Sequence, residues 1–117
     1  MDEHFDTQQA KEFLASRELQ EREQREHERI AVLTLVTDSL KKLFSHSNVE
    51  VYLVGSITKP YAFYPHSDVD VVLRNFQGDR FDIWTKLETM ITRNVEIIIF
   101  KDCHFQEHVI SAGYKVV

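Results

Sequence analysis

The spacing of apolar and polar positions predicts a long helix in the first third of the chain. From about Thr7 to Phe44 the sequence contains no Gly or Pro and many Glu, Gln, Arg, Leu and Ala residues, which favour a helix. Its second half repeats apolar residues at three- and four-residue steps and therefore needs a packing surface. This apolar stripe consists of Ile30, Leu33, Val36, Leu40, Leu43 and Phe44.

The first half of this predicted helix is polar. Residues 20–29 contain no apolar side chain, and Glu18 precedes Arg22 by four residues, a spacing that stabilises an isolated helix. We therefore expect residues 1–29 to form a projecting polar helical extension, which is either solvated or grips a partner. The apolar side chains of this extension lie far from the stripe and are Phe13, Leu14 and Leu19.

Beyond Phe44 the period becomes that of strands. Three runs rich in Val, Ile and Leu predict strands covered on both faces, and two stretches have helical spacing. The predicted strands are 49–54, 69–73 and 95–100, and the predicted helices are 82–91 and 105–112. Residues 30–117 are therefore expected to form one small α/β (α+β) domain, with a mixed sheet flanked by helices.

Composition is that of a globular protein in a reducing compartment. The 117 residues allow one ordinary domain, and 43% hydrophobic with 28% charged residues is a globular balance. The single Cys103 cannot form an internal disulfide, and the chain shows no membrane span and no signal peptide. We expect a cytoplasmic protein without a membrane partner.

The net charge of −5 narrows the partners further. Nineteen acidic residues outnumber fourteen basic ones, and no basic stripe is present. This argues against a nucleic-acid partner, because neutralisation of phosphates supplies most of that affinity. A small anionic substrate remains compatible with the charge if a metal ion accompanies it.

Most of the candidate chemistry follows the first predicted strand. Gly55-Ser56 ends that strand, and Asp68 and Asp70 stand two residues apart at the start of the second, so their carboxylates share one face. Two such carboxylates repel each other unless a cation lies between them, and Mg²⁺ or Mn²⁺ takes oxygen ligands of this kind. Glu96 interrupts the third predicted strand and supplies a third acid.

Gly55 and Ser56 indicate what such a metal would hold. Gly55 lets a phosphate approach the main chain closely, and Ser56 adds a hydroxyl donor. The layout suits a nucleoside triphosphate whose phosphates meet the metal, with an acceptor hydroxyl activated opposite Glu96.

The order Gly-Ser, Asp-x-Asp and a lone acid on a following strand resembles the DNA polymerase β-type nucleotidyltransferase superfamily. Over roughly residues 30–117 it resembles the minimal nucleotidyltransferase (MNT) domain more closely. The resemblance implies a nucleotidyltransferase-like fold, triphosphate binding by Gly55 and Ser56, and catalysis and metal binding by Asp68, Asp70 and Glu96. It also implies transfer of a nucleoside monophosphate, commonly AMP from ATP, onto a hydroxyl, and a HEPN-type helical toxin as a partner.

The loop after Gly55-Ser56 departs from the Arg-rich, Gly-containing loop that is usual in that family. Lys59 is its only basic residue that could contact the triphosphate. The aromatic side chains of this loop either stack a base, receive a partner or anchor the loop over the sheet; they are Tyr61, Phe63 and Tyr64.

Two functions of different classes follow. The first is a Mg²⁺-dependent nucleotidyltransferase acting on a hydroxyl of a partner protein. The second is a catalytically weak or inactive binding module that neutralises a helical partner by occlusion, with the long helix as its grip. The long helix could also join two copies of the chain. Among the acids, Asp102 lies just past the third predicted strand and is an alternative to Glu96 as the third carboxylate.

Overall fold

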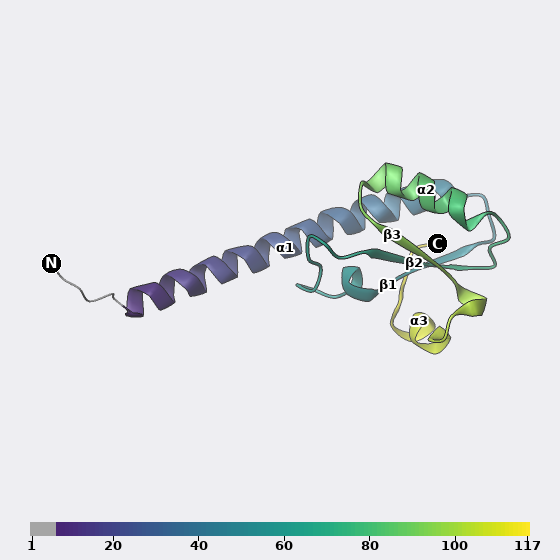
Figure 1. Cartoon of the computed structure of the whole chain (residues 1–117). Coiled ribbons are helices and arrows are strands. Elements are labelled where there is room, and N and C mark those ends of the chain that lie inside the picture. The colour runs from purple at the N-terminus through teal and green to yellow at the C-terminus, as the bar shows by residue number, and fades with distance from the viewer. Residues whose placement is uncertain (1–6) are drawn as a thin grey trace.

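The chain folds as an α+β protein with one four-stranded sheet, in a computed structural model that describes residues 7–117. Its elements are α1 (Thr7–Phe44), β1 (Glu50–Val54), η1 (Gly55–Thr58), β2 (Val69–Arg74), α2 (Arg80–Ile91), β3 (Val95–Ile99), η2 (Phe100–Asp102), α3 (Gln106–Ala112) and β4 (Tyr114–Lys115). The strand order is β3-β2-β1-β4 (Figure 1). This confirms the expected class, a small mixed sheet flanked by helices with a long N-terminal helix. The first six residues of the predicted extension lie outside the described residues.

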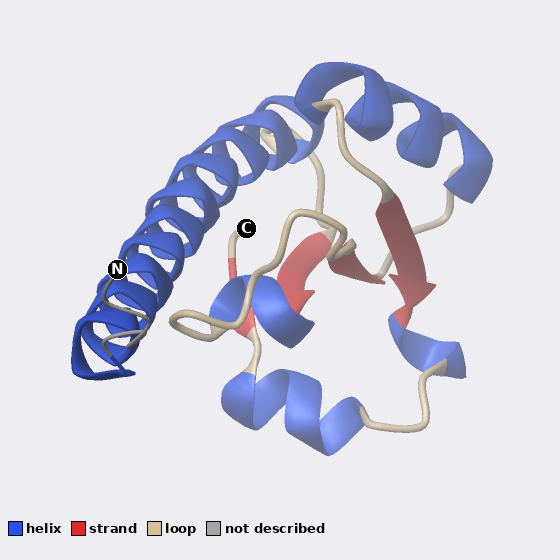
Figure 2. Cartoon of the chain, turned by 60° about the vertical axis from the view of Figure 1, so that its left-hand side comes forward, coloured by secondary structure: helices blue, strands red, loops and turns tan. Residues whose placement is uncertain are grey.

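Strand directions make the sheet mixed. β1 runs antiparallel to β2 and to β4, whereas β2 and β3 are parallel and are joined through α2 (Figure 2). The edge strand β4 was not predicted, because it has two residues and both are exposed. Its register pairs Tyr114 with Leu53 and Lys115 with Tyr52.

Helices cover both faces of the sheet, as the near-continuous apolar strands predicted. Val69, Val71 and Leu73 of β2 belong to the larger core, which α1 and α2 complete. Val72, between them, packs in a second cluster with Val109 of α3 on the opposite face. Successive residues of β2 therefore point to different layers.

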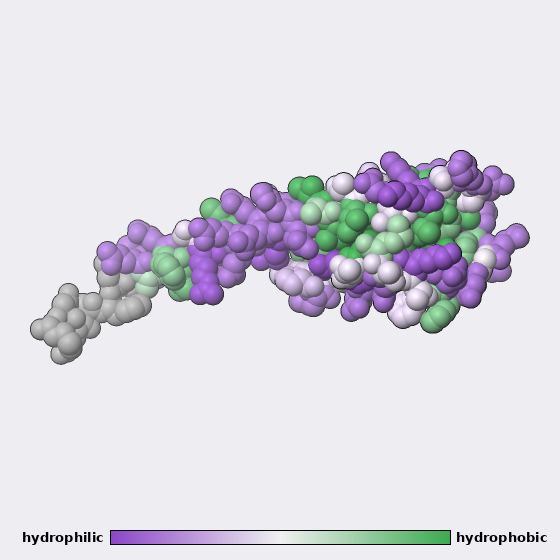
Figure 3. Space-filling view, turned by 90° about the horizontal axis from the view of Figure 1, so that it is seen from above, coloured by the Kyte–Doolittle hydropathy of each residue, from purple (hydrophilic) through white to green (hydrophobic). Residues whose placement is uncertain are grey.

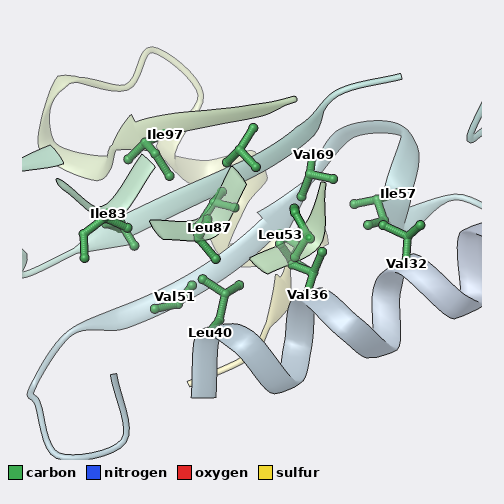
Figure 4. Close-up of a cluster of buried hydrophobic side chains, with 14 of the residues drawn as sticks. Val32, Val36, Leu40, Val51, Leu53, Ile57, Val69, Ile83, Leu87 and Ile97 are labelled. Carbon is green, nitrogen blue, oxygen red and sulfur yellow. The ribbon is translucent and has the colours of Figure 1, made fainter. Parts of the chain in front are cut away.

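The larger core is built on the apolar stripe of α1. Val36, Leu40 and Phe44 are buried as expected, and the side chains of Val36 and Leu40 face the sheet (Figure 4). Ile30, expected in the stripe, is 49% exposed, and Val32 takes the buried place instead. Val32 precedes Val36 by four residues, whereas a spacing of six turns Ile30 away from the core.

α1 extends well beyond the sheet. Its 38 residues correspond to about 57 Å of helix, and the molecule measures 72 × 29 × 19 Å. The projecting part is mostly hydrophilic (Figure 3), with the exposed side chains of Phe13, Leu14 and Leu19 at 66%, 55% and 54%. Further along α1, the guanidinium groups of Arg22 and Arg25 lie over the rings of Tyr61 and Tyr64. Despite its length, α1 is too polar to cross a membrane, and the other described helices also lack a membrane-spanning stretch.

The packing of the core predicts that alanine substitutions at two leucines of α1 lower the free energy of unfolding by different amounts. Leu40→Ala removes a fully buried side chain from the contact with the sheet and is expected to lower the free energy of unfolding by about 3 kcal/mol. Leu35→Ala, at a side chain that is 43% exposed on the same helix, is the matched control and should cost less than about 0.5 kcal/mol. Urea unfolding measures both, and equal losses would contradict the packing described here.

Candidate active site

The sheet register sets two of the three predicted carboxylates, those of Asp70 and Glu96, on neighbouring strands side by side. Asp70 is the register partner of Val54 on β1 and of Glu96 on β3. Asp70 and Glu96 lie on the face of α3, since Val72 and Ile98, two residues further along each strand, pack in the cluster on that face. The parallel pairing of β2 with β3 thus aligns Glu96 with the Asp68-x-Asp70 pair.

Electrostatics show how close these groups are. Burial, the charge of Glu96, a hydrogen bond with Glu96 and the charge of Asp68 together raise the pKa of the Asp70 carboxyl to about 6, and burial contributes most. Asp70 is partly buried, whereas Asp68 and Glu96 are exposed. Glu96 therefore needs no partner to offset burial, contrary to the reasoning from its place in an apolar strand.

Gly55 lies directly against Asp70. Its φ is +81°, a conformation that L side chains rarely adopt. A Cβ added to Gly55 would lie 2.6 Å from Oδ2 of Asp70, closer than such atoms can approach. The chain therefore favours glycine where β1 turns into η1, and the main chain at this turn adjoins the Asp70 carboxylate.

Ser56 and Lys59 belong to the same turn. The Ser56 carbonyl accepts from the backbone N–H of Lys59 at 3.1 Å, and Thr58 Oγ1 donates to the Gly55 carbonyl at 2.7 Å. Ser56 is partly buried, while Lys59 is exposed. The turn thus carries all three predicted phosphate-binding residues, with Gly55 and Ser56 at its start and Lys59 directly after its end.

The chemistry of these groups fits a hard divalent cation. All three side chains offer carboxylate oxygens, and the excess of negative charge around Asp70 is what a bound cation would neutralise. Within residues 7–117, however, no three His, Cys, Asp or Glu side chains are already gathered closely enough to hold a metal ion. Metal binding by Asp68, Asp70 and Glu96 therefore stays a prediction.

Arg93 holds the segment that leads into Asp68. Its Nη2 donates to the carbonyls of Tyr64, Pro65 and Ser67 at 2.9, 3.1 and 3.1 Å. Its guanidinium also lies over the Phe63 ring, 4.2 Å from the centroid. Arg93 was not predicted, because these acceptors lie 26–29 residues away in the sequence.

Residues of α1 hold the other end of the same loop. We call Arg22, Arg25, Glu26 and Arg29 the α1 clamp, because each contacts the segment from Ile57 to Tyr64. The clamp was not predicted, because residues 20–29 were expected to belong to a projecting extension that is either solvated or grips a partner. A signal was present: these residues continue, at three- and four-residue steps, the face that carries Val32 and Val36.

The aromatic loop is explained by these contacts. Phe63 is buried in the larger core. The guanidinium of Arg22 lies 4.2 Å from the Tyr61 ring centroid, and that of Arg25 lies 4.6 Å from the Tyr64 ring centroid. Of the three interpretations offered for this loop, the geometry favours anchoring.

The remaining candidates do not join the site. Asp102 is exposed in η2, past the end of β3. His108 lies in α3 and His104 precedes it, so the two do not share a helix face, and both are exposed. Cys103 is partly buried against the cluster under α3, which agrees with a packing role.

Comparisons with known proteins return little. No protein-family model matches this chain, and no curated protein does. A chain in the crystal structure of a mutant of the toxin-antitoxin MntA-HpeT is similar in structure, with a TM-score of 0.48 and 16% identity. The match covers 76% of this chain and 71% of that chain. Similarity at this level does not define a family, so function is inferred from the chain's own residues.

The raised pKa of Asp70 predicts how stability depends on pH in metal-free protein. Its folded-state pKa of about 6 exceeds the ordinary value of 3.8, so the wild type should lose stability as pH rises from about 4 to 7. Asp70→Asn removes this loss, and we expect it to gain about 1 kcal/mol over the wild type between pH 4 and pH 8, after allowance for solvent screening. Urea unfolding with a chelator measures this gain. Asp102→Asn, at an exposed acid, is the control, and equal pH dependence in the two variants would contradict the prediction.

The turn at Gly55 gives a second expectation. Gly55→Ala introduces a side chain at positive φ and forces it against Asp70, so it should lower the free energy of unfolding by about 1 kcal/mol or more. Gly78→Ala is the control, because its Cβ would meet only the far edge of the Phe76 ring and should cost less. Thermal unfolding at neutral pH compares the two, and a larger loss in Gly78→Ala would refute the close approach.

Proposed function

We propose that this protein is a nucleotidyltransferase that moves a nucleoside monophosphate, AMP from ATP in particular, onto a hydroxyl group. One observation carries the proposal: the register places Glu96 beside Asp70, two residues from Asp68, while Gly55 adjoins Asp70. This arrangement brings together the residues by which the sequence resembles MNT domains.

The roles of the residues follow from their positions. Asp68, Asp70 and Glu96 would hold Mg²⁺ or Mn²⁺, which when bound supplies charge neutralisation for a triphosphate and lowers the pKa of an attacking oxygen. The main chain at Gly55 and the Ser56 hydroxyl would donate to the phosphates, and Lys59 would add a positive charge at the open end of the turn. Because the three carboxylates would repel the negatively charged phosphates, triphosphate binding requires a cation between them.

The transfer itself forms one bond and breaks one. The acceptor oxygen attacks the α-phosphorus, the bond from that phosphorus to the bridging oxygen breaks, and pyrophosphate leaves. Glu96 is exposed beside Asp70 and is the carboxylate best placed to take the proton that the acceptor hydroxyl loses. Because burial and neighbouring acids raise the pKa of Asp70, a bound cation would favour its charged form.

The acceptor is a partner protein in this proposal, and a HEPN-type helical toxin is the partner that the family resemblance suggests. A second candidate function is an antitoxin that acts by occlusion. It is favoured by the exposed apolar side chains of Phe13, Leu14 and Leu19 on the projecting part of α1, which catalysis does not use. Both functions allow the same partner, so labelling must separate them.

Incubation with ATP radiolabelled on its α-phosphate, Mg²⁺ and the protein encoded beside this chain tests the proposal. We expect the partner to become labelled, and Asp70→Asn and Glu96→Gln each to reduce the initial rate about a hundredfold or more. Asp102→Asn should label at the wild-type rate, since Asp102 lies outside the site.

The outcomes separate the two functions. Labelling that persists in Asp70→Asn and Glu96→Gln would remove these residues from catalysis. A tight complex that never takes up label, and whose formation is lost on substitution of Phe13 and Leu14 by Glu, would favour occlusion over transfer.

A further inference from the structure

The α1 clamp is more than a set of surface ion pairs, because Glu26 and Arg29 bond the main chain of a distant loop. Arg29 donates from Nε and Nη2 to the two carboxylate oxygens of Glu26, both at 2.7 Å. Its Nη1 donates to the Ile57 carbonyl at 2.9 Å. Glu26 Oε1 also accepts from the backbone N–H of Tyr61 at 2.9 Å. One pair on α1 thus satisfies main-chain groups 28 and 35 residues away.

The surroundings make this pair stronger than an ordinary helix pair. The side chains of Arg29 and Glu26 are only 11% and 16% exposed, and their contact uses two parallel hydrogen bonds. The hydrogen bonds from Arg29 and Tyr61 lower the pKa of Glu26 to about 2. Arg17 and Glu21, one or more turns earlier on α1, form a single bond of 3.2 Å and are 66% and 55% exposed.

The bonded loop is the one that carries the candidate phosphate-binding turn. Ile57 directly follows Gly55-Ser56, and Ile57 and Tyr61 lie two residues on either side of Lys59. The Ile57 side chain is fully buried toward Val32 of α1 (Figure 4), so an apolar contact and a polar contact fix the same segment. The remaining loop is held by Arg93, which leaves the Ile57–Tyr61 stretch dependent on α1.

From this geometry we infer that Glu26 and Arg29 are positioning residues for the nucleotide site, so that α1 is part of the site's machinery. They do not touch the nucleotide. They hold the turn at the spacing from Asp70 that triphosphate binding needs. Only the kinetic test of this inference rests on the proposed function, since the hydrogen-exchange test does not require activity. The inference supplies a role for a polar stretch of α1 that neither the core nor catalysis explains.

Amide hydrogen exchange and steady-state kinetics on the full chain test this inference. Arg29→Met removes every donor but keeps the apolar stem, and we expect the Tyr61 amide to exchange about tenfold faster or more, with amides of α2 and β3 unchanged. Arg29→Lys keeps the charge and a single donor and should fall between Arg29→Met and the wild type. Arg17→Met, which breaks the exposed pair on the same helix, is the matched control and should exchange as the wild type does.

Kinetics add a measurement that a merely structural role would not move. In Arg29→Met we expect KM for ATP to rise about fivefold or more while kcat changes less than about twofold, with partial recovery in Arg29→Lys. Unchanged exchange at Tyr61, or faster exchange spread evenly over the whole domain, would overturn the positioning role. A wild type without any transferase activity whose Tyr61 amide is still released in Arg29→Met would refute the proposed function and leave the positioning contact in place.

Discussion

The parallel pairing of β2 with β3 is the constraint on which the rest of this structure depends. It sets Asp70 opposite Glu96, and because side chains alternate along each strand, it also sends Val71 and Ile97 into the core under α1 and α2. A slip of β3 by one residue against β2 would turn Glu96 toward the core and Ile97 away from it, while Asp70 and Val71 would stay in place through the pairing of β2 with β1. The free energy of core packing therefore holds the acids in register, and the repulsion around Asp70 is tolerated because the core forbids the alternative.

The loop between β1 and β2 is fixed from outside the sheet. Its start is bonded to Glu26 and Arg29 of α1, and its end is bonded to Arg93, which follows α2. The loop contributes the side chains of Ile57 and Phe63 to the larger core. The guanidinium groups of Arg29 and Arg93 thus fix the two ends of the loop through its main-chain carbonyls.

Much of the fold could be predicted from the period of the apolar residues, and the rest depended on partners that a single sequence does not identify. The long helix and three strands follow from runs of apolar residues, yet Ile30 was assigned to a face that Val32 occupies. Asp68-x-Asp70 with Gly55-Ser56 could be recognised locally, whereas the contact of Glu96 with Asp70 required knowledge of which strands are neighbours. The spacing of Arg29 from Val32 and Val36 indicates that it faces the domain, but its partner could not be predicted, because a main-chain carbonyl leaves no trace in residue type.

The helical face shared by Arg22, Arg29, Val36 and Leu40 restricts where α1 can change in length. Arg22 and Leu40 are eighteen residues apart, which is five turns of an α-helix, so the charged contacts and the apolar contacts are in phase. Insertion of one residue between these two groups would swing the first by about 100° and separate it from its loop. A change in length before Arg22 would leave these contacts in phase, so we expect the chain to tolerate insertions in the projecting part of α1 and not between Arg22 and Leu40.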